Sequence, residues 1–327
     1  MYHQLTAQER YTVAVFKREG RSMRGIARAL GFSPSTISRE LKRNSCHATD
    51  GAYRPTKAQE RTNGRRRRSR KVKHHAPAVY DWIEEQLLDN QWSPEQIADQ
   101  AREVLGVRIS AMTIYRHVRD RQRQGDVALA TQLRHGRKRR RKRTFGPEKR
   151  GKLQGKPMID TRPAAVELRQ EVGHWEGDTV MGCAGERSCL LTIVERSSGW
   201  GVVVRLRNRT VHALNRAAIA AIRSSGLPFK TITWDNGTEF HGYRDIDDAA
   251  GTQSYFAYPH HPWQRGSNEN FNGLLRQYFP KRKSLSRIRQ ADCDAVAAKL
   301  NQRPRKRYGF QTPEQRLKES GVLHLGC

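Results

Sequence analysis

The stretch Gly173-His-Trp-Glu-Gly-Asp-Thr-Val180 is where the spacing of apolar residues changes from a helical to a strand-like pattern. Apolar runs over residues 175–181, 189–195 and 201–206 each have the length and composition of a β-strand. The tripeptide Ser-Ser-Gly at residues 197–199 supplies turn-forming residues between the last two runs. The sequence therefore predicts three consecutive strands in this part of the chain.

A helix and two further strands complete the predicted sheet. Residues 211–222 carry apolar side chains at helical spacing behind the capping residue Thr210, and residues 229–234 and 254–258 are apolar runs of strand length. Strands that follow one another directly pair as antiparallel neighbours, whereas strands separated by a helix can pair in parallel. We therefore expect a mixed sheet in an α/β domain.

Two aspartates occupy informative positions in this predicted sheet. Asp178 falls inside the first strand, where burial of a carboxylate costs free energy unless a positive charge lies beside it. Asp235 follows the apolar run 229–234, and the next two residues, Asn236-Gly237, stop that strand. Because α/β sheets bind ligands at the ends of their strands, Asp235 is well placed to be a metal ligand.

A third carboxylate, Glu269, belongs to a helix predicted to start at Gly266. The helix buries an apolar stripe at positions i, i+3, i+4 and i+7, formed by Phe271, Leu274, Leu275 and Tyr278. Glu269 faces away from this stripe, among side chains that suit a scissile phosphate and its neighbours. These side chains are Arg265, Asn272 and Arg276.

Asp178, Asp235 and Glu269 are the candidate catalytic and metal-ligating residues. Three oxygen ligands of this kind hold Mg²⁺, or the similar Mn²⁺, and leave coordination positions open for water and phosphate oxygens. Two such ions per site activate the attacking oxygen and stabilise the leaving oxygen in an in-line displacement. The residues therefore point to metal-dependent phosphoryl transfer.

Two other carboxylates compete for these roles. Glu176 shares a strand face with Asp178, so it either ligates the metal or forms an ion pair with a neighbouring arginine. Glu239 lies four residues beyond Asp235 and is also a possible ligand. We expect both to support the site rather than to form its core.

The first sixty residues predict a DNA-binding module. A helix from Ser22 is broken by Gly31-Phe32-Ser33, and Pro34 opens the next helix, which together make a helix-turn-helix. In this motif the second helix enters the major groove of DNA. A plain three-helix packing unit is the alternative, and the Ser, Thr and Arg content of the last helix disfavours it. The candidate DNA contacts are Ser35, Thr36, Ser38, Arg39 and Arg43.

A second, weaker helix-turn-helix pattern occupies residues 76–125. Ser93-Pro94 opens one predicted helix, and residues 109–117 resemble a recognition helix that begins behind Ser110. The packing-only alternative is stronger here, because Met112, Ile114 and Tyr115 could all belong to a core. The candidate DNA contacts are Thr113, Tyr115 and Arg116.

The chain has 62 Lys and Arg against 32 Asp and Glu, a formal net charge of +30. Residues 1–160 contribute +21 of this charge, so the grip on a polyanion is concentrated in the first half. Two basic tracts dominate it, at residues 65–73 and 137–143. Because like charges repel and resist burial, we expect both tracts to be flexible linkers that contact phosphates. In the first tract the candidate contacts are Arg65, Arg66, Arg67 and Arg68.

Targeting signals and cysteine chemistry add little. The five cysteines form no CxxC pair, which favours reduced thiols over a zinc knuckle or a disulfide framework. Neither an apolar run long enough to span a membrane nor a signal peptide is evident, so we expect a soluble cytoplasmic protein without a membrane partner.

The three carboxylates and their surroundings resemble the catalytic signature of bacterial DDE transposases. The segments are the one that contains Asp178, the run Thr-Trp-Asp235-Asn-Gly-Thr-Glu-Phe, and Trp263-Gln-Arg-Gly-Ser-Asn-Glu269-Asn-Phe-Asn-Gly-Leu-Leu-Arg. The resemblance is to the IS-thirty family of insertion sequences, within the RNase H-like, retroviral-integrase superfamily. Residues 22–43 and 300–314 also resemble this family, so the likeness spans nearly the whole chain.

The resemblance implies an enzyme that binds the terminal inverted repeats of an insertion sequence, cleaves the ends and joins them to target DNA. It places the catalytic triad on Asp178, Asp235 and Glu269. It also implies a bacterial, nucleoid-associated protein that acts on double-stranded DNA as a homodimer or larger synaptic assembly. The expected domains are a helix-turn-helix at 1–60, basic linkers at 61–75 and 126–165, a second helix-turn-helix-like domain at 76–125, and an RNase H-like catalytic domain with a helical extension at 166–327.

Two other functions remain open at this point. A transcription regulator would use the helix-turn-helix and carry an inactive catalytic-like domain, which the intact carboxylates argue against. A nuclease of the same fold would cleave structured nucleic acid, and it would neither need two sequence-reading modules nor join a cut end to a second duplex.

Overall fold

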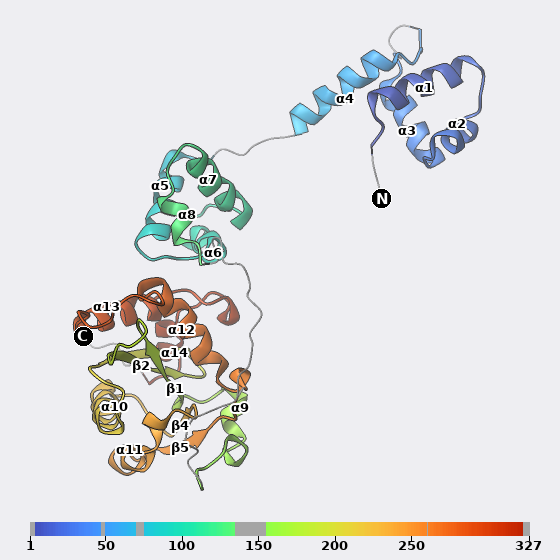
Figure 1. Cartoon of the computed structure of the whole chain (residues 1–327). Coiled ribbons are helices and arrows are strands. Elements are labelled where there is room, and N and C mark those ends of the chain that lie inside the picture. The colour runs from blue at the N-terminus through green and yellow to red at the C-terminus, as the bar shows by residue number, and fades with distance from the viewer. Residues whose placement is uncertain (1–3, 47–49, 70–74, 135–154, 260, 323–327) are drawn as a thin grey trace. The chain divides into compact units, whose positions relative to one another are not determined.

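The computed structural model describes residues 4–46, 50–69, 75–134, 155–259 and 261–322 (Figure 1). The chain divides into two compact units, Met1–Ala76 and Pro77–Cys327. The boundary lies one residue beyond the end of the first linker that the sequence predicts, residues 61–75. The second basic tract, residues 137–143, lies outside the described residues.

The first unit is a helical module around a small apolar core. Gly31 ends α2 in the left-handed conformation (φ 70°), and Ser33 caps α3 by accepting a hydrogen bond from the backbone N–H of Thr36. A buried ion pair between Arg10 and Glu40, with 2.8 Å between Nε and Oε1, ties α1 to α3. The helices are α1 (Ala7–Arg18), α2 (Met23–Leu30), α3 (Pro34–Asn44) and α4 (Pro55–Ser69).

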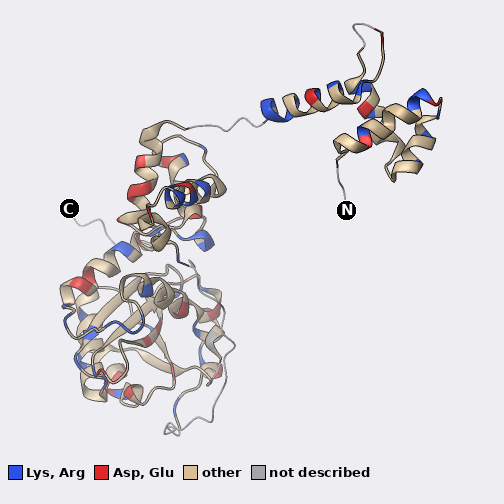
Figure 2. Ribbon diagram, turned by 45° about the horizontal axis from the view of Figure 1, so that its top comes forward, with Lys and Arg blue, Asp and Glu red and all other residues tan. Residues whose placement is uncertain are grey.

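Residues 61–69 are helical rather than part of a flexible linker, which corrects the expectation for the first basic tract. Arg61 donates hydrogen bonds to the backbone carbonyls of Asn44 and Ser45 at the end of α3, and Arg65 donates to the side-chain oxygen of Asn44. These guanidinium groups meet the negative end of the α3 dipole, which offsets part of the repulsion among like charges. The basic final turns of α4 are blue in Figure 2.

The second unit begins with another helical module. Its core includes Ile83, Ile97, Ile114 and also Leu129, which lies beyond the boundary at residue 125 that the sequence suggests. Residues up to 132 are therefore part of this module and not of a linker. The helices are α5 (Pro77–Leu88), α6 (Pro94–Val104), α7 (Ala111–Arg123) and α8 (Ala128–Gln132).

The rest of this unit is built on a five-stranded mixed sheet in the order β3-β2-β1-β4-β5. β1, β2 and β3 pair as antiparallel neighbours, whereas β4 and β5 run parallel to β1. This confirms the mixed sheet with antiparallel leading strands. The strands are β1 (His174–Met181), β2 (Cys189–Glu195), β3 (Gly201–Leu206), β4 (Thr231–Trp234) and β5 (Gln253–Phe256).

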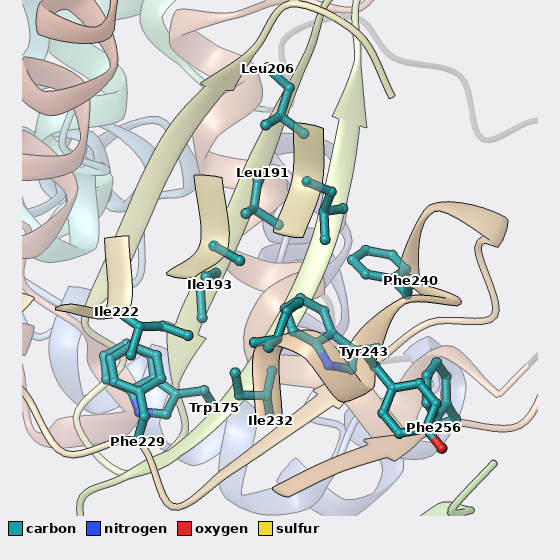
Figure 3. Close-up of a cluster of buried hydrophobic side chains, with 14 of the residues drawn as sticks. Trp175, Leu191, Ile193, Leu206, Ile222, Phe229, Ile232, Phe240, Tyr243 and Phe256 are labelled. Carbon is teal, nitrogen blue, oxygen red and sulfur yellow. The ribbon is translucent and has the colours of Figure 1, made fainter. Parts of the chain in front are cut away.

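Helices cover both faces of the sheet and make three layers. On one face, α10 (Val211–Ser225) and α11 (Tyr243–Ala250) pack over the apolar cluster in Figure 3. On the other face, α12 (Gly266–Tyr278) and α13 (Gln290–Asn301) pack against β1, β2 and β3. The remaining short helices are η1 (Ile159–Thr161), α9 (Ala165–Leu168), η2 (Thr238–Phe240), η3 (Pro262–Arg265), η4 (Lys306–Tyr308) and α14 (Pro313–Glu319).

The sequence misjudges some element boundaries. β4 starts at Thr231 instead of residue 229, because Phe229 leaves the strand to stack on Trp175, with 4.1 Å between ring centroids. β5 ends at Phe256 instead of residue 258. α11 is absent from the sequence prediction.

Gly177→Ala will destabilise the second unit. A Cβ at position 177 would lie 2.1 Å from the ring of Trp234, which is fully buried, so the ring or the strand would have to shift. Overpacking of this kind costs about 1–3 kcal/mol, or roughly 2–12 °C in Tm. Thermal unfolding of Gly266→Ala provides the control, since a Cβ there meets nothing within 4 Å. Equal Tm values for the two variants would contradict the packing described for β1 and β4.

Candidate active site

Asp178 lies on the face of β1 that α12 covers. Its Oδ1 accepts a hydrogen bond from the backbone N–H of Thr179, and its Oδ2 accepts one from Nδ2 of Asn272 at 3.1 Å. Alternation along the strand places Glu176 on the same face and Thr179 on the opposite face. Asp178 is therefore oriented toward the helix that carries Glu269.

Asp235 lies next to Asp178 because β4 is the parallel neighbour of β1. The guanidinium of Arg265 faces both carboxylates, with Nη1 3.4 Å from Oδ2 of Asp178 and Nη2 4.0 Å from Oδ2 of Asp235. Burial raises the pKa of Asp178 to about 6; Arg265 opposes this shift, and the negative charge of Asp235 adds to it. The guanidinium of Arg265 thus offsets part of the repulsion between the two carboxylates.

Glu269 is exposed in the first turn of α12, where it and Asp178 line a pocket of about 530 Å³. The structure thus brings Asp178 together with Asp235 on the sheet and with Glu269 across the pocket. Among the residues that the structure describes, no three His, Cys, Asp or Glu side chains lie close enough together to hold a metal ion.

The first turn of α12 is anchored to the sheet by Asn268, a fully buried residue that the sequence prediction missed. Its backbone N–H donates to Oε2 of Glu176 at 2.9 Å, and its Nδ2 donates to the carbonyl oxygens of Glu176 and Thr192. The position of Asn268 in the sequence could have revealed this role. Asn268 precedes Phe271 by three residues and so lies on the apolar stripe, where a buried polar side chain needs hydrogen-bond partners within the protein. Asn268 fixes the position of its neighbour Glu269.

Glu176 forms the ion pair that the sequence left as one alternative. Its side chain is fully buried, and its Oε1 accepts a hydrogen bond from Nη1 of Arg196 at 2.8 Å. Its other oxygen accepts the backbone N–H of Asn268. Both carboxylate oxygens are therefore occupied, one by Arg196, which follows β2, and the other by Asn268, which ties β1 to α12.

Glu239 belongs to the other side of the sheet. Its Oε1 accepts a hydrogen bond from the hydroxyl of Thr179 at 2.7 Å, and only 2% of the side chain is exposed. Since Thr179 and Asp178 point to opposite faces of β1, the sheet separates Glu239 from the pocket that Glu269 lines.

The other predicted phosphate contacts of this region lie around the same carboxylates. Arg265 donates to the backbone carbonyl of Gly177 as well as facing the two aspartates. Asn272 and Arg276 line the pocket with Glu269. The face of α12 that the sequence assigns to DNA is thus the face that meets Asp178.

In the first unit, the candidate contacts lie on the outer side of α3. Ser35, Ser38, Arg39 and Arg43 are exposed, whereas Ile37 is buried in the core. A groove of about 400 Å³ is lined by residues of both α3 and the basic tract of α4. Its lining includes Thr36, Arg39, Arg43, Arg65 and Arg66, while Arg67 and Arg68 are exposed on the last turn of α4.

Of the three α7 residues that could have formed a core instead of contacting DNA, one is buried. Ile114 is buried, whereas Met112 and Tyr115 are 57% and 40% exposed. Arg116 is exposed and Thr113 is half-buried, so the predicted contact residues remain accessible.

No helix in the described part of the chain combines the length and the apolar character required to cross a lipid bilayer.

Comparisons with known proteins bear on the whole chain. Residues 1–44 match a family described as a helix-turn-helix domain, and residues 169–262 match the integrase core domain. The transposase for insertion sequence element IS1086 of Cupriavidus metallidurans is 36% identical over 97% of this chain and 94% of its own length. The transposase for IS4351 of Bacteroides fragilis is 35% identical, over 98% and 97%. The transposase InsI for IS30A of Escherichia coli is 37% identical, over 97% and 84%.

These relatives support an enzyme of transposition and integration, and not the transcription regulator that the sequence left open. Proteins with this integrase core generally depend on divalent metal ions, and the two matched domains imply DNA as the partner. The protein is therefore a DDE-type nuclease and strand transferase. With such identity over nearly its whole length, the chain belongs to the IS30, or IS-thirty, family of insertion-sequence transposases.

Proposed function

We propose that Asp178, Asp235 and Glu269 are the catalytic carboxylates with which this transposase cleaves the terminal inverted repeats of its element and joins them to target DNA. The observation that carries the proposal is the juxtaposition of Asp178 and Asp235 on neighbouring parallel strands, with Glu269 across the adjoining pocket. Metal-dependent nicking and joining of an end-bearing oligonucleotide tests it.

The chemistry of the three carboxylates suits Mg²⁺ or Mn²⁺, two ions per site, and Glu269 would have to approach the two aspartates across the pocket to share an ion with them. All three groups are carboxylates, which these hard cations prefer, and the aspartates already share one positive charge, that of Arg265. When bound, the ions supply a nucleophile at neutral pH and neutralise charge on the attacking and leaving oxygens. Bound ions would supply the positive charge that Arg265 now places beside the aspartates, which would leave this guanidinium available for a DNA phosphate.

Other side chains would hold this site in shape. Asn272 orients Asp178 through the hydrogen bond to Oδ2, and Asn268 fixes the start of α12 beside Glu269. Arg276 and Arg265 provide guanidinium groups for phosphates next to the scissile bond, because planar guanidinium matches phosphate geometry in pairs of hydrogen bonds.

We assign recognition of the terminal repeats to α3 and α7, with α4 as a phosphate contact. Residues on the outer side of α3 would read base edges, and the arginines of α4 would hold the backbone on the other wall of the same groove. Because strand transfer requires two ends to be held together, we expect a homodimer or larger synaptic complex, acting at the bacterial nucleoid.

Arg39→Ala will weaken binding to the terminal repeat more than binding to random DNA. A base contact by arginine contributes about 1–3 kcal/mol of discrimination, so affinity for the cognate site should fall roughly 5- to 150-fold. Replacing residues 65–68 with alanine should instead weaken all DNA alike and flatten the salt dependence. Fluorescence anisotropy on both duplexes measures these effects; equal losses on cognate and random DNA for Arg39→Ala would remove it from base reading.

A further inference from the structure

Arg134, at the end of the helical module α5–α8, lines the same pocket as Glu269 and Asp178. The residue comes two positions after α8, more than forty positions before Asp178 in the sequence. The sequence prediction did not name Arg134 as a site residue. The matched integrase core, which starts at residue 169, does not contain it either. A module that resembles a DNA reader thus contributes a cation to the candidate active site.

Polar contacts hold this module against the helices that carry the site. Gln277 of α12 donates to the carbonyl of Gln132 at 3.2 Å, and Tyr278 donates to the carbonyl of Asn90. Arg303, which is buried, links the two parts by donating to Gln96 of α6 and to Gln277. Arg134 therefore reaches the pocket from a docked element.

The backbone of α12 makes room for Arg134 at Gly273, one helical turn after Glu269. A Cβ added at position 273 would lie 2.4 Å from Nη2 of Arg134. The absence of a side chain there lets the guanidinium lie directly against the helix. Since the conflicting atom is the far end of a flexible side chain, an alanine at this position would displace the guanidinium without disturbing the helix.

The charges of the pocket divide into two groups. Asp178 and Glu269 are the acids assigned to the metal ions, and Arg134, Arg276 and Lys281 are cations on the same lining. Arg276 is half-buried, and this burial lowers the pKa of its guanidinium. Once metal ions occupy the two acids, the three cations would attract an anion. The DNA substrate of this enzyme carries such an anion, a backbone phosphate, at each nucleotide.

We propose that Arg134, Arg276 and Lys281 form a subsite for a DNA backbone phosphate adjacent to the scissile phosphate, with Arg134 delivered by the α5–α8 module. The proposal rests on the assignment of the carboxylates above. It couples the docking of the α5–α8 module to catalysis, because the subsite is complete only while that module lies against α12.

A binding experiment without divalent metal locates the phosphate independently of catalysis. The full-length protein is mixed with end-bearing duplexes in which single neutral methylphosphonates replace each phosphate around the cleavage point. We expect a methylphosphonate at one position adjacent to that point to weaken the binding of the wild-type protein about tenfold. The same methylphosphonate should leave the binding of Arg134→Ala unchanged. Identical profiles for the two proteins would overturn the proposal, whatever the triad variants show.

Cleavage rates provide the second arm. Arg134→Ala and Gly273→Ala should both lower the cleavage rate about 10- to 100-fold in Mg²⁺, and Arg134→Lys should recover part of the loss. Gly273→Ala should at the same time keep or raise the Tm, since alanine favours a helix over glycine. Arg216→Ala on the exposed side of α10 is the charge-matched control. Rates for Arg134→Ala equal to those of the control would contradict the subsite.

Discussion

Asp178→Asn, Asp235→Asn and Glu269→Gln will each reduce cleavage and joining by at least about 1,000-fold while binding to the terminal repeat stays within about twofold of normal. Each substitution keeps the size of the side chain and removes one negative oxygen ligand, so the fold and the DNA-reading helices are untouched. Gel assays of nicking and joining, together with a binding isotherm for each variant, measure the two effects separately.

The double variants distinguish joint action from independent contributions. Because the carboxylates would act as one unit, Asp178→Asn combined with Glu269→Gln should be hardly less active than either single variant. Glu239→Gln is the matched control, since it removes a carboxylate that follows Asp235 by four residues but lies on the opposite face of the sheet. Full activity in the single variants would refute the assignment of the triad.

Glu176→Ala will lower the Tm of the second unit by about 6–20 °C, an effect of about 3–5 kcal/mol. The substitution leaves the buried guanidinium of Arg196 without one of its carboxylate partners and the backbone N–H of Asn268 without its acceptor. Removing one member of a buried ion pair is costly because the remaining charge stays out of water. Differential scanning calorimetry gives the shift directly.

Glu176→Gln separates the charge from the hydrogen bonds. The amide oxygen can still accept the N–H of Asn268, and Arg196 keeps its second contact, with Glu167 at 3.1 Å. We therefore expect a smaller loss of Tm and measurable cleavage. Loss of activity in Glu176→Gln at a normal Tm would instead indicate that Glu176 takes part in catalysis.

The strand and helix patterns of the catalytic region were readable from the sequence because apolar spacing records burial. β2 and β3 have the predicted bounds, and α12 starts at Gly266 as predicted. The stripe of α12 is also correct for Phe271, Leu274 and Leu275. The resemblance grouped Asp178 with Asp235, whereas the sheet order that makes β4 the parallel neighbour of β1 was not predicted.

Features that depend on contacts between distant segments were not readable. Residues 65–68 resemble a linker because of their charge. They are helical beside the C-terminal end of α3, where Arg61 and Arg65 donate hydrogen bonds to Asn44. Glu176 and Glu239 differ in role because alternation along β1 puts Glu176 on one face of the sheet and Thr179, the partner of Glu239, on the other. The position of Arg134 follows from the docking of α8 on α12, which no local pattern records.

Joining of a pre-cut terminal repeat isolates strand transfer from cleavage and from recognition of the uncut end, so it depends on the catalytic carboxylates themselves. An oligonucleotide with a free 3′-hydroxyl is incubated with supercoiled plasmid and Mg²⁺, with the protein as wild type, Glu269→Gln or Glu239→Gln. We expect joined product from wild type and Glu239→Gln and none from Glu269→Gln. Wild-type joining by Glu269→Gln, with loss in Glu239→Gln, would contradict the third ligand and the active-site face proposed for this enzyme.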